Sequence, residues 1–320
     1  MFNYIVRRLN LLLFTLLMLS LLAYCIDYSL VNQGAEGMVG GYFRFLGRLM
    51  DGDLGFSASS KLPVADLIRL HLPATVELCL AALLLAMVMG ITLGTLAALN
   101  QGRWIDRIIL GLSLLGYAIP AYWLGMLLIM TLSMDLGWLP SSGQLSLLYE
   151  VKPVTGFTLV DAWLSHSPYR QAALHDALAH LLLPAVVLAI VPTTEVIRLV
   201  RASMINVLKQ NYIKAAFSRG LSAPRVMFKH GLRNALPPIV PMLSLQFGSL
   251  VTAAVITEVV FSWPGMGRWL VNSILARDYA AIEGGILVIA CFLVVVNLLS
   301  ESLTMLLYPA KRKDLYGQED

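Results

Sequence analysis

Long apolar stretches separated by polar segments dominate the chain. A helix needs roughly 20 mostly apolar residues to cross the hydrocarbon core of a bilayer. Six stretches are long enough, at residues 9–28, 74–99, 108–134, 180–200, 239–261 and 286–308. Longer mixed segments occupy residues 30–73, 135–179 and 201–238. The pattern therefore predicts an all-α fold, a polytopic membrane protein with six transmembrane helices.

The first apolar stretch follows Arg7 and Arg8, as the apolar core of a signal peptide would. The residues Leu22-Ala23-Tyr24-Cys25 also faintly resemble a lipoprotein cleavage site. Tyr24, however, is too bulky for the small position before the cysteine, and the apolar run is long enough to span the membrane. We therefore expect this stretch to be retained as an anchor helix.

The composition supports a membrane protein and excludes several other classes. Of the 320 residues, 58% are hydrophobic and 13% are charged, and the mean hydropathy is +0.76. An ordinary soluble domain has roughly 45–50% apolar and about 25% charged residues. With half the usual charge, the chain could not cover a folded surface in water. A soluble enzyme, a disordered regulator and a secreted disulfide scaffold are therefore excluded.

The lysines and arginines indicate how the stretches are oriented. With the N-terminus inside, the cytoplasmic segments hold fifteen of the 23 basic residues and the outer segments hold eight. Cytoplasmic loops of membrane proteins carry such an excess, so we predict that both termini are cytoplasmic. The net charge of +4 then reflects topology and contact with membrane lipid, and no nucleic-acid partner is needed to explain it.

Motifs for the common hydrolytic chemistries are missing from the sequence. There is no Gly-Lys dipeptide, so the phosphate-binding loop G-x-x-x-x-G-K-[ST] is absent, and neither H-E-x-x-H nor G-x-S-x-G occurs. His175 and His180 flank Asp176, but a spacing of five residues puts them on different faces of a helix. The three cysteines lie in apolar runs and are expected to be buried thiols. We predict no enzymatic activity, no metal site and no cofactor.

Four carboxylates fall within or at the ends of the predicted spans: Glu77, Glu195, Glu258 and Glu301. Each would cost roughly 2.5–3.5 kcal/mol at the centre of a membrane helix. Glu195 lies three residues before Arg198, so an ion pair along the helix is expected, and Glu301 is also expected to be structural. Glu77 and Glu258 lie near the outer leaflet and are candidates for the substrate pathway, with structural pairing as an equal alternative.

Glycines and prolines within the stretches predict local packing and bends. Gly90 and Gly94 are four residues apart, a spacing that is typical of close helix–helix contact in membranes. Pro120 and Pro192 each remove a backbone hydrogen bond and predict kinks. Such kinks are compatible with a moving, water-accessible core and equally with rigid packing.

The segment 201–238 predicts two helices joined by a tight turn. A first helix is expected over residues 205–217, ending at Arg219-Gly220. Ser222 can begin a second helix that tolerates Pro224 in its first turn and continues to Arg233. Two interpretations of this basic, exposed element stay open. It either lies on anionic lipid or docks on a soluble partner and transmits force.

Lys214-Ala215-Ala216, followed after three residues by Gly220, resembles the E-A-A-x-x-x-G loop of ABC-transporter permeases, with lysine in place of the first glutamate. In that family the loop forms a short helix that seats in a cleft of the ATPase subunit. The resemblance implies that Lys214, Ala215, Ala216, Arg219 and Gly220 form an ATPase-coupling loop. Arg219 would pair with acidic residues of the ATPase.

Further motifs, in order over nearly the whole chain, are similar to the oligopeptide/dipeptide branch of these permeases. They are Gly52-Asp53-Leu54-Gly55, Leu72-Pro73-Ala74-Thr75, Leu136-Gly137-Trp138-Leu139-Pro140, His230-x-x-Arg233-Asn234-Ala235-Leu236-Pro237, and Pro264-Gly265-x-Gly267 with Arg277-Asp278-Tyr279. Segments 148–153, 161–165 and 261–265 resemble the Sap-type permeases of Gram-negative bacteria.

The resemblance implies an inner-membrane subunit with a type I ABC importer-like transmembrane domain. It also implies a second homologous permease subunit, two ATP-binding subunits and a periplasmic solute-binding protein as partners. We expect residues 1–73 to form an anchor helix and a periplasmic segment, residues 74–308 the transmembrane domain, and residues 309–320 a cytoplasmic tail. ATP hydrolysis on the separate subunits would drive alternating access.

Several functions compete. Sap-type permeases have been associated with uptake of cationic antimicrobial peptides and also with putrescine export, so we expect peptide transport, with polyamine export as the alternative. An ion-gradient-driven secondary carrier would transport alone, but the sequence shows no convincing internal repeat of the kind such carriers often have. A polytopic enzyme would need a nucleophile or metal within the spans, and none stands out.

Overall fold

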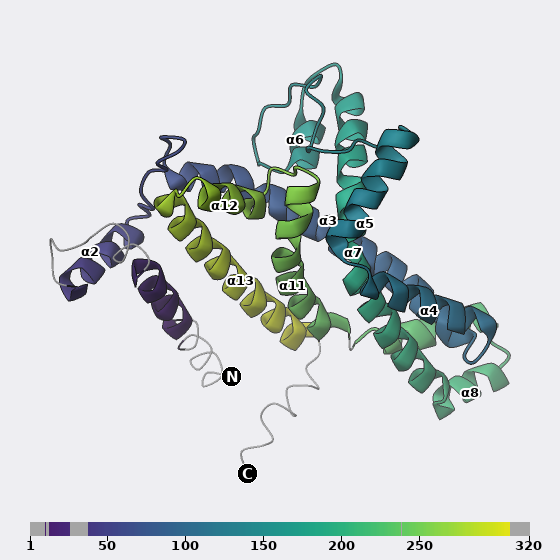
Figure 1. The fold of residues 1–320 in the computed structure, drawn as a ribbon. Helices are drawn as coiled ribbons and strands as arrows, with labels where there is room; N and C mark the ends of the chain where they lie inside the picture. The colour runs from purple at the N-terminus through teal and green to yellow at the C-terminus, as the bar shows by residue number, and fades with distance from the viewer. Residues whose placement is uncertain (1–9, 11–12, 26–37, 238, 308–320) are drawn as a thin grey trace, which may run out of the picture.

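The computed structural model describes residues 10, 13–25, 38–237 and 239–307, and these residues form a helical fold (Figure 1). They form no β-sheet, and their one isolated β-bridge joins Phe56 to Pro63. The short helices α6 (Thr158–Leu164) and α8 (Asn211–Ser218) lie toward opposite ends of the molecule, which we call the α6 end and the α8 end. Arg7, Arg8, the tail 309–320 and the side chain of Glu301 lie outside the described part.

Helices occupy most of the described part of each of the six predicted stretches. A helix at Leu13–Cys25 belongs to the first stretch. The other elements, in chain order, are α2 (Met38–Met50), α3 (Val64–Leu99), α4 (Trp104–Ala118), α5 (Ala121–Leu128), the π-helix η1 (Ile129–Asp135), α6, α7 (Arg170–Leu208), α8, α9 (Ala223–Val226), the π-helix η2 (Met227–Leu232), α10 (Arg233–Ala235), α11 (Ile239–Val260), α12 (Met266–Leu275) and α13 (Tyr279–Leu307).

Three of the described helices are each long and apolar enough to cross a membrane, namely α3, α7 and the Tyr279–Leu299 part of α13. The bent pair Trp104–Ala118 and Ala121–Asp135 would add a fourth crossing, and Leu13–Cys25 and Gln246–Val260 are shorter apolar helices. The helical membrane class is therefore confirmed, and the number of six crossings stays a prediction. Both α3 and α7 begin about ten residues before the predicted limits.

The third predicted span is broken rather than kinked. Its two halves, α4 and α5 with η1, meet at an angle of 100°. Pro120 has no backbone N–H, and it disfavours helical backbone at the preceding residue. Ile119 is accordingly extended, with φ −79° and ψ 127°. Pro184 and Pro192 lie within the continuous helix α7, so proline alone did not determine where a helix breaks.

The core is built around the contact between α3 and α7. A Cβ placed on Gly94 would lie 2.8 Å from the carbonyl oxygen of Ile197 and 2.8 Å from Val200 Cβ, and Gly90 faces Val196 in the same way. The glycine pair therefore lets the two helices approach closely, as the spacing predicts. Small residues of α3, including Cys79, continue the contact toward α11 and form the largest buried cluster.

The predicted helix over 205–217 is wrong at its start. Helix α7 continues to Leu208, the backbone is extended at Gln210 with φ −70° and ψ 148°, and α8 begins at Asn211. The break turns the chain, so that apolar side chains of α8 are buried. The second predicted helix is present over 223–235, but its middle turn, η2, is a π-helix.

Candidate functional site

Glu258, one of the two candidate pathway carboxylates, is fully buried near the end of α11. Thr75 Oγ1 donates a hydrogen bond to Glu258 Oε1 at 2.6 Å, and the backbone N–H of Arg268 donates to Oε2 at 2.9 Å. Gly265 is packed so tightly on this carboxylate that a Cβ there would overlap it. Glu258 therefore holds the turn before α12 against both α11 and α3.

Glu77, the other candidate, is buried where α3 meets the loop before α6. Its carboxylate accepts hydrogen bonds from the backbone N–H groups of Thr158 and Leu159, at 3.1 and 2.8 Å, and from Gln144 Nε2 at 3.0 Å. These donors come from the 136–157 loop and the start of α6. Glu77 therefore fastens that loop to α3.

A third carboxylate, Asp161, organises the same loop from within. It accepts hydrogen bonds from Thr155 N at 2.8 Å, Thr155 Oγ1 at 2.7 Å and Gly156 N at 3.0 Å. Burial opposes ionisation of Asp161, but these hydrogen bonds outweigh it and hold the pKa of the carboxyl below its ordinary value. The loop is thus fixed by an ionised carboxylate.

Asp278 performs a similar role at the turn between α12 and α13. It is fully buried and accepts hydrogen bonds from Ser57 Oγ at 2.5 Å, Ser59 Oγ at 2.7 Å, and the backbone N–H groups of Ala58 and Ser59 at 3.0 Å. Although burial opposes ionisation, these donors together hold the pKa of Asp278 well below its ordinary value.

These four carboxylates, Glu77, Asp161, Glu258 and Asp278, therefore accept hydrogen bonds from several protein groups each. Their contacts give Glu77 and Glu258 the structural partners of one alternative, and a position on the substrate pathway stays a prediction. Sequence reasoning missed Asp161 and Asp278 as anchoring groups. The motif around Asp278 gave only a weak signal, because Arg277 directly before it is an equally plausible partner in the sequence.

At the other end, the segment 209–237, which we call the elbow, has one buried side. Ile213, Ala216 and Val226 form a small cluster, against which Val207 and Leu208 of α7 pack. Ala216 is only 8% exposed, so its small size serves packing within the elbow rather than contact with a partner. The elbow is therefore amphipathic and sits firmly on the end of α7.

The turn of the elbow is made by Gly220, which has φ +77°. Its N–H bonds to the carbonyl of Phe217 at 2.9 Å, and the N–H of Leu221 bonds to that of Ala216 at 3.3 Å. No atom lies within 4 Å of a Cβ built on Gly220. Glycine is thus favoured by the left-handed backbone and not by lack of space.

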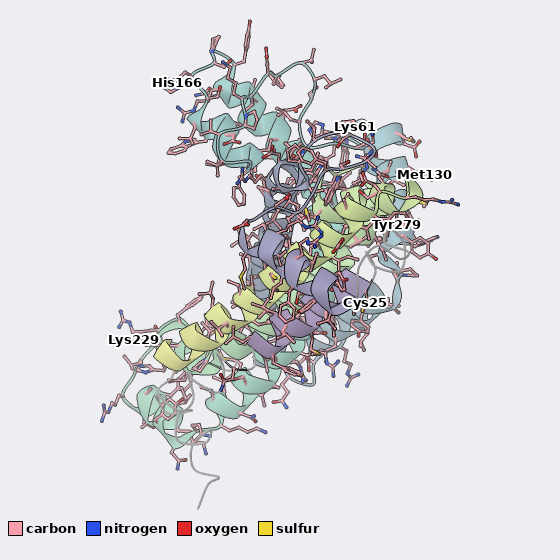
Figure 2. All side chains as sticks on the ribbon, turned by 90° about the vertical axis from the view of Figure 1, so that its left-hand side faces the viewer. Cys25, Lys61, Met130, His166, Lys229 and Tyr279 are labelled. Atoms are coloured by element: carbon pink, nitrogen blue, oxygen red, sulfur yellow. The ribbon has the colours of Figure 1, made fainter. Side chains whose placement is uncertain are left out.

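The opposite side of the elbow is exposed, basic and partly aromatic. Tyr212 and Phe217 remain 45% and 48% exposed, and Phe228 is 63% exposed. The exposed basic residues are Lys209, Lys214, Arg219, Arg225, Lys229 and Arg233, and Ala215 is exposed among them. Figure 2 shows Lys229 and His166 near opposite ends of the molecule.

Two further contacts connect the elbow to the bundle. Ser203 Oγ of α7 donates a hydrogen bond to the carbonyl of Ala235 at 2.8 Å. Gly231 packs on Met204, whose Cε would lie 2.9 Å from an added Cβ. Movement of the elbow is therefore coupled to the end of α7.

A partly buried ion pair, which sequence reasoning did not predict, connects α4 to α7 nearby. Arg201 Nε and Nη2 donate to the two oxygens of Asp106 at 2.6 and 2.7 Å, and the N–H of Gly102 donates to Asp106 Oδ2 at 2.9 Å. This bidentate geometry is the strong form of a charged hydrogen bond. Arg201, three residues after Arg198, thus fixes the turn before α4 to α7.

Glu195 does not form the predicted ion pair with Arg198. Its carboxylate accepts a hydrogen bond from Gln246 Nε2 of α11, and Arg198 is exposed. Helical spacing makes the Glu195–Arg198 pair possible, but the approach of α11 provides another donor. Among the described residues, no three His, Cys, Asp or Glu side chains are arranged to hold a metal ion.

Residues 90–313 match the sequence profile of the family described as binding-protein-dependent transport system inner membrane component. The chain belongs to this family of transport permeases. The permease is 45% identical over 320 residues to the putrescine export system permease protein SapB of Escherichia coli strain K12, and 46% identical to the peptide transport system permease protein SapB of Salmonella typhimurium strain LT2. Each match covers 99% of both chains.

A solved structure gives an independent comparison of the fold. The permease superposes on the crystal structure of an amino acid ABC transporter with histidines with a TM-score of 0.50 and 18% sequence identity, covering 77% of the permease and 94% of that chain. The predicted fold class, an ABC-importer transmembrane domain, is confirmed. The permease is accordingly a multi-pass protein of the inner membrane.

Proposed function

We propose that the permease is one of two transmembrane subunits of an ATP-driven peptide importer. The other subunits would be a second homologous permease, two ATP-binding subunits and a periplasmic solute-binding protein. Catalysis would reside in the ATP-binding subunits alone. The family description and the peptide-transport name of the Salmonella typhimurium relative support this proposal. In it, Glu77 and Glu258 hold the outer face of the gate together.

The observation that carries the proposal is the two-sided elbow. Its inner side packs on α7, while Lys214, Ala215 and Arg219 face outward. A partner seated on the exposed side would push or pull directly on α7 and, through Arg201 and Asp106, on α4. We therefore propose that Lys214, Ala215, Ala216, Arg219 and Gly220 form the coupling loop, with Ala216 holding the loop in shape.

Ala215→Trp tests this assignment. Ala215 is exposed and a larger side chain can point away from the fold, so folding should be retained. We expect at least a tenfold loss of ATP-driven uptake in proteoliposomes and loss of co-purification with the ATP-binding subunits, because the indole separates the two surfaces. Ala215→Ser is the matched control and should behave like the wild type. Normal coupling in Ala215→Trp would overturn the assignment.

The same variant separates docking from the alternative in which the elbow lies on lipid. On a membrane surface, an added tryptophan strengthens attachment through its apolar, interfacial ring. A lipid-bound elbow would therefore keep its ATPase coupling, whereas a docked elbow loses it. Transport by the purified permease alone, under an ion gradient, would instead support a secondary carrier.

Putrescine export is the second candidate, because the Escherichia coli relative bears that name. Direction and solute are decided together by measuring labelled putrescine and a labelled cationic peptide in vesicles of both orientations. We expect ATP-dependent peptide uptake into right-side-out vesicles supplied with the binding protein. ATP-dependent accumulation of putrescine in inside-out vesicles, without peptide uptake in the other orientation, would overturn the import proposal.

A further inference from the structure

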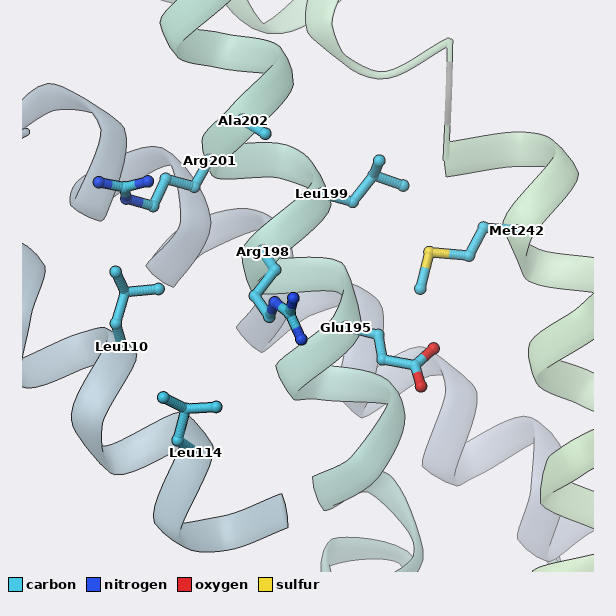
Figure 3. Close-up of a pocket in the computed structure, with 8 residues that line it drawn as sticks. All are labelled: Leu110, Leu114, Glu195, Arg198, Leu199, Arg201, Ala202 and Met242. Carbon is cyan, nitrogen blue, oxygen red and sulfur yellow. The ribbon is translucent and has the colours of Figure 1, made fainter. Parts of the chain in front are cut away.

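A cavity of about 750 Å³ opens between α4, α7 and α11. Most of its wall is apolar, but α7 also brings charged side chains to it (Figure 3). The lining residues are Leu110, Leu114, Glu195, Arg198, Leu199, Arg201, Ala202 and Met242. The volume lies in the range of sites that bind small molecules.

The charged groups of the cavity are not all compensated. Arg201 is already paired with Asp106 through two hydrogen bonds. Among the described residues, Glu195 accepts a hydrogen bond only from the neutral amide of Gln246 and has no basic partner. Arg198 has no acidic partner among the described residues. The cavity thus presents one uncompensated anion and one uncompensated cation.

These two charges are placed as a pair of opposite sign on one helix. Glu195 and Arg198 are three residues apart, a spacing at which side chains share a helix face. Glu195 lies six residues from Arg201, which corresponds to roughly 9 Å along the helix axis away from the Asp106–Arg201 pair. Ionisable groups among membrane-spanning helices are costly and generally serve a function. Their failure to pair with each other leaves both available to a ligand.

We propose that this cavity binds the transported solute, and that the solute it accepts is a short zwitterionic peptide. The terminal ammonium group would bind at Glu195, the terminal carboxylate at Arg198, and the side chains against the leucines and Met242. A diamine such as putrescine carries no anionic group and would meet the Arg198 guanidinium as a like charge. The inference rests on the proposed function and narrows its substrate class.

The test measures binding of labelled trialanine to the assembled permease–ATPase complex in nanodiscs, without the binding protein. Glu195→Gln and Arg198→Gln keep the side-chain shape and should each weaken binding at least about tenfold. N-acetylation of the peptide should weaken binding to the wild type but not further in Glu195→Gln, and C-terminal amidation should behave likewise with Arg198→Gln. Arg69→Gln, at an exposed surface pair, is the matched control.

A second variant guards against loss of folding in the charge mutants. Ala202→Phe fills part of the cavity without removing either charge and should also weaken trialanine binding. Unchanged binding in Glu195→Gln and Arg198→Gln, or tighter binding of putrescine than of trialanine, would overturn the inference.

Phosphatidylethanolamine is a competing zwitterion, since it carries an ammonium and a phosphate. Nanodiscs made with and without this lipid distinguish the two. We expect trialanine binding, and its loss in the variants, in both preparations. If the variants change only the retention of phosphatidylethanolamine, the inference is wrong. ATP-driven uptake of trialanine by the complete wild-type assembly tests the proposed function separately, because it does not depend on which residues form the cavity.

Discussion

Single carboxylates at the α6 end fasten segments that are distant in sequence. Glu258 connects α11 to α3 and to the turn before α12, and Asp278 connects the α12–α13 turn to residues 57–59. Each is fully buried and accepts several hydrogen bonds, which compensates for its lost hydration. At the residue scale, family motifs such as Arg277-Asp278-Tyr279 are thus explained by anchoring.

Asp278→Asn should destabilise the protein by about 1.5–3 kcal/mol, the usual range for hydrogen bonds to a charged group. The amide cannot accept all the donors of Ser57, Ala58 and Ser59. Thermal unfolding in detergent measures the loss. Asp66→Asn, at an exposed ion pair, is the control and should leave the melting temperature nearly unchanged.

The stability difference between the wild type and Asp278→Asn should also depend on pH in a defined direction. The folded-state pKa of Asp278 lies below its value in the unfolded chain, which is roughly 3.9. Its contribution is therefore complete above about pH 5 and declines progressively as the pH falls from there toward the folded-state pKa. The difference in melting temperature between wild type and Asp278→Asn should shrink on acidification. A constant difference from pH 7 to pH 3 would contradict the assignment.

Close packing of α3 on α7 depends on glycine at the scale of whole helices. Gly94 contacts the backbone of α7 directly, so any side chain there must push the two helices apart. Gly111 of α4, in contrast, has no atom within 4 Å of an added Cβ. The two positions differ in packing while both belong to apolar helices.

Gly94→Leu should therefore destabilise the fold by about 1–3 kcal/mol or more, the range for overpacked cores. Gly111→Leu should have little effect, because the new side chain points into open space. Melting temperature and yield of detergent-purified protein compare the two variants directly. Equal behaviour of both would show that the α3–α7 contact is not the constraint.

At the scale of the whole molecule, the two ends carry different kinds of surface. The α6 end carries the loops held by buried carboxylates, and the α8 end carries the basic elbow (Figures 1 and 2). Basic residues of the elbow are exposed as a group. With the excess of basic residues inside, the α8 end would face the cytoplasm.

Cysteine labelling with a membrane-impermeant maleimide tests this orientation. In a background where the exposed Cys25 is replaced by serine, we expect His166→Cys to react in right-side-out vesicles and Lys229→Cys only in inside-out vesicles. Cys79 is buried and should stay unreactive in both. The reverse labelling pattern would overturn the N-in topology.

The sequence by itself determined the features that depend on composition, period and local backbone. The membrane class, the helical fold, the glycine contact of α3 and the turn at Gly220 all follow from short-range chemistry. The family could also be recognised from the sequence, because its motifs are spread along the chain. Each of these features is determined by residues that are close in sequence, or by whether a whole segment prefers lipid to water.

Only the tertiary structure decided which polar groups meet. Whether Glu195 contacts Arg198 or Gln246, and which groups donate hydrogen bonds to Glu258, depend on elements far apart in sequence. The break at Pro120, compared with the continuous helix α7 through Pro192, likewise depends on surrounding packing. Hydrogen bonds need positions within about 3 Å, and the order of residues does not supply that precision.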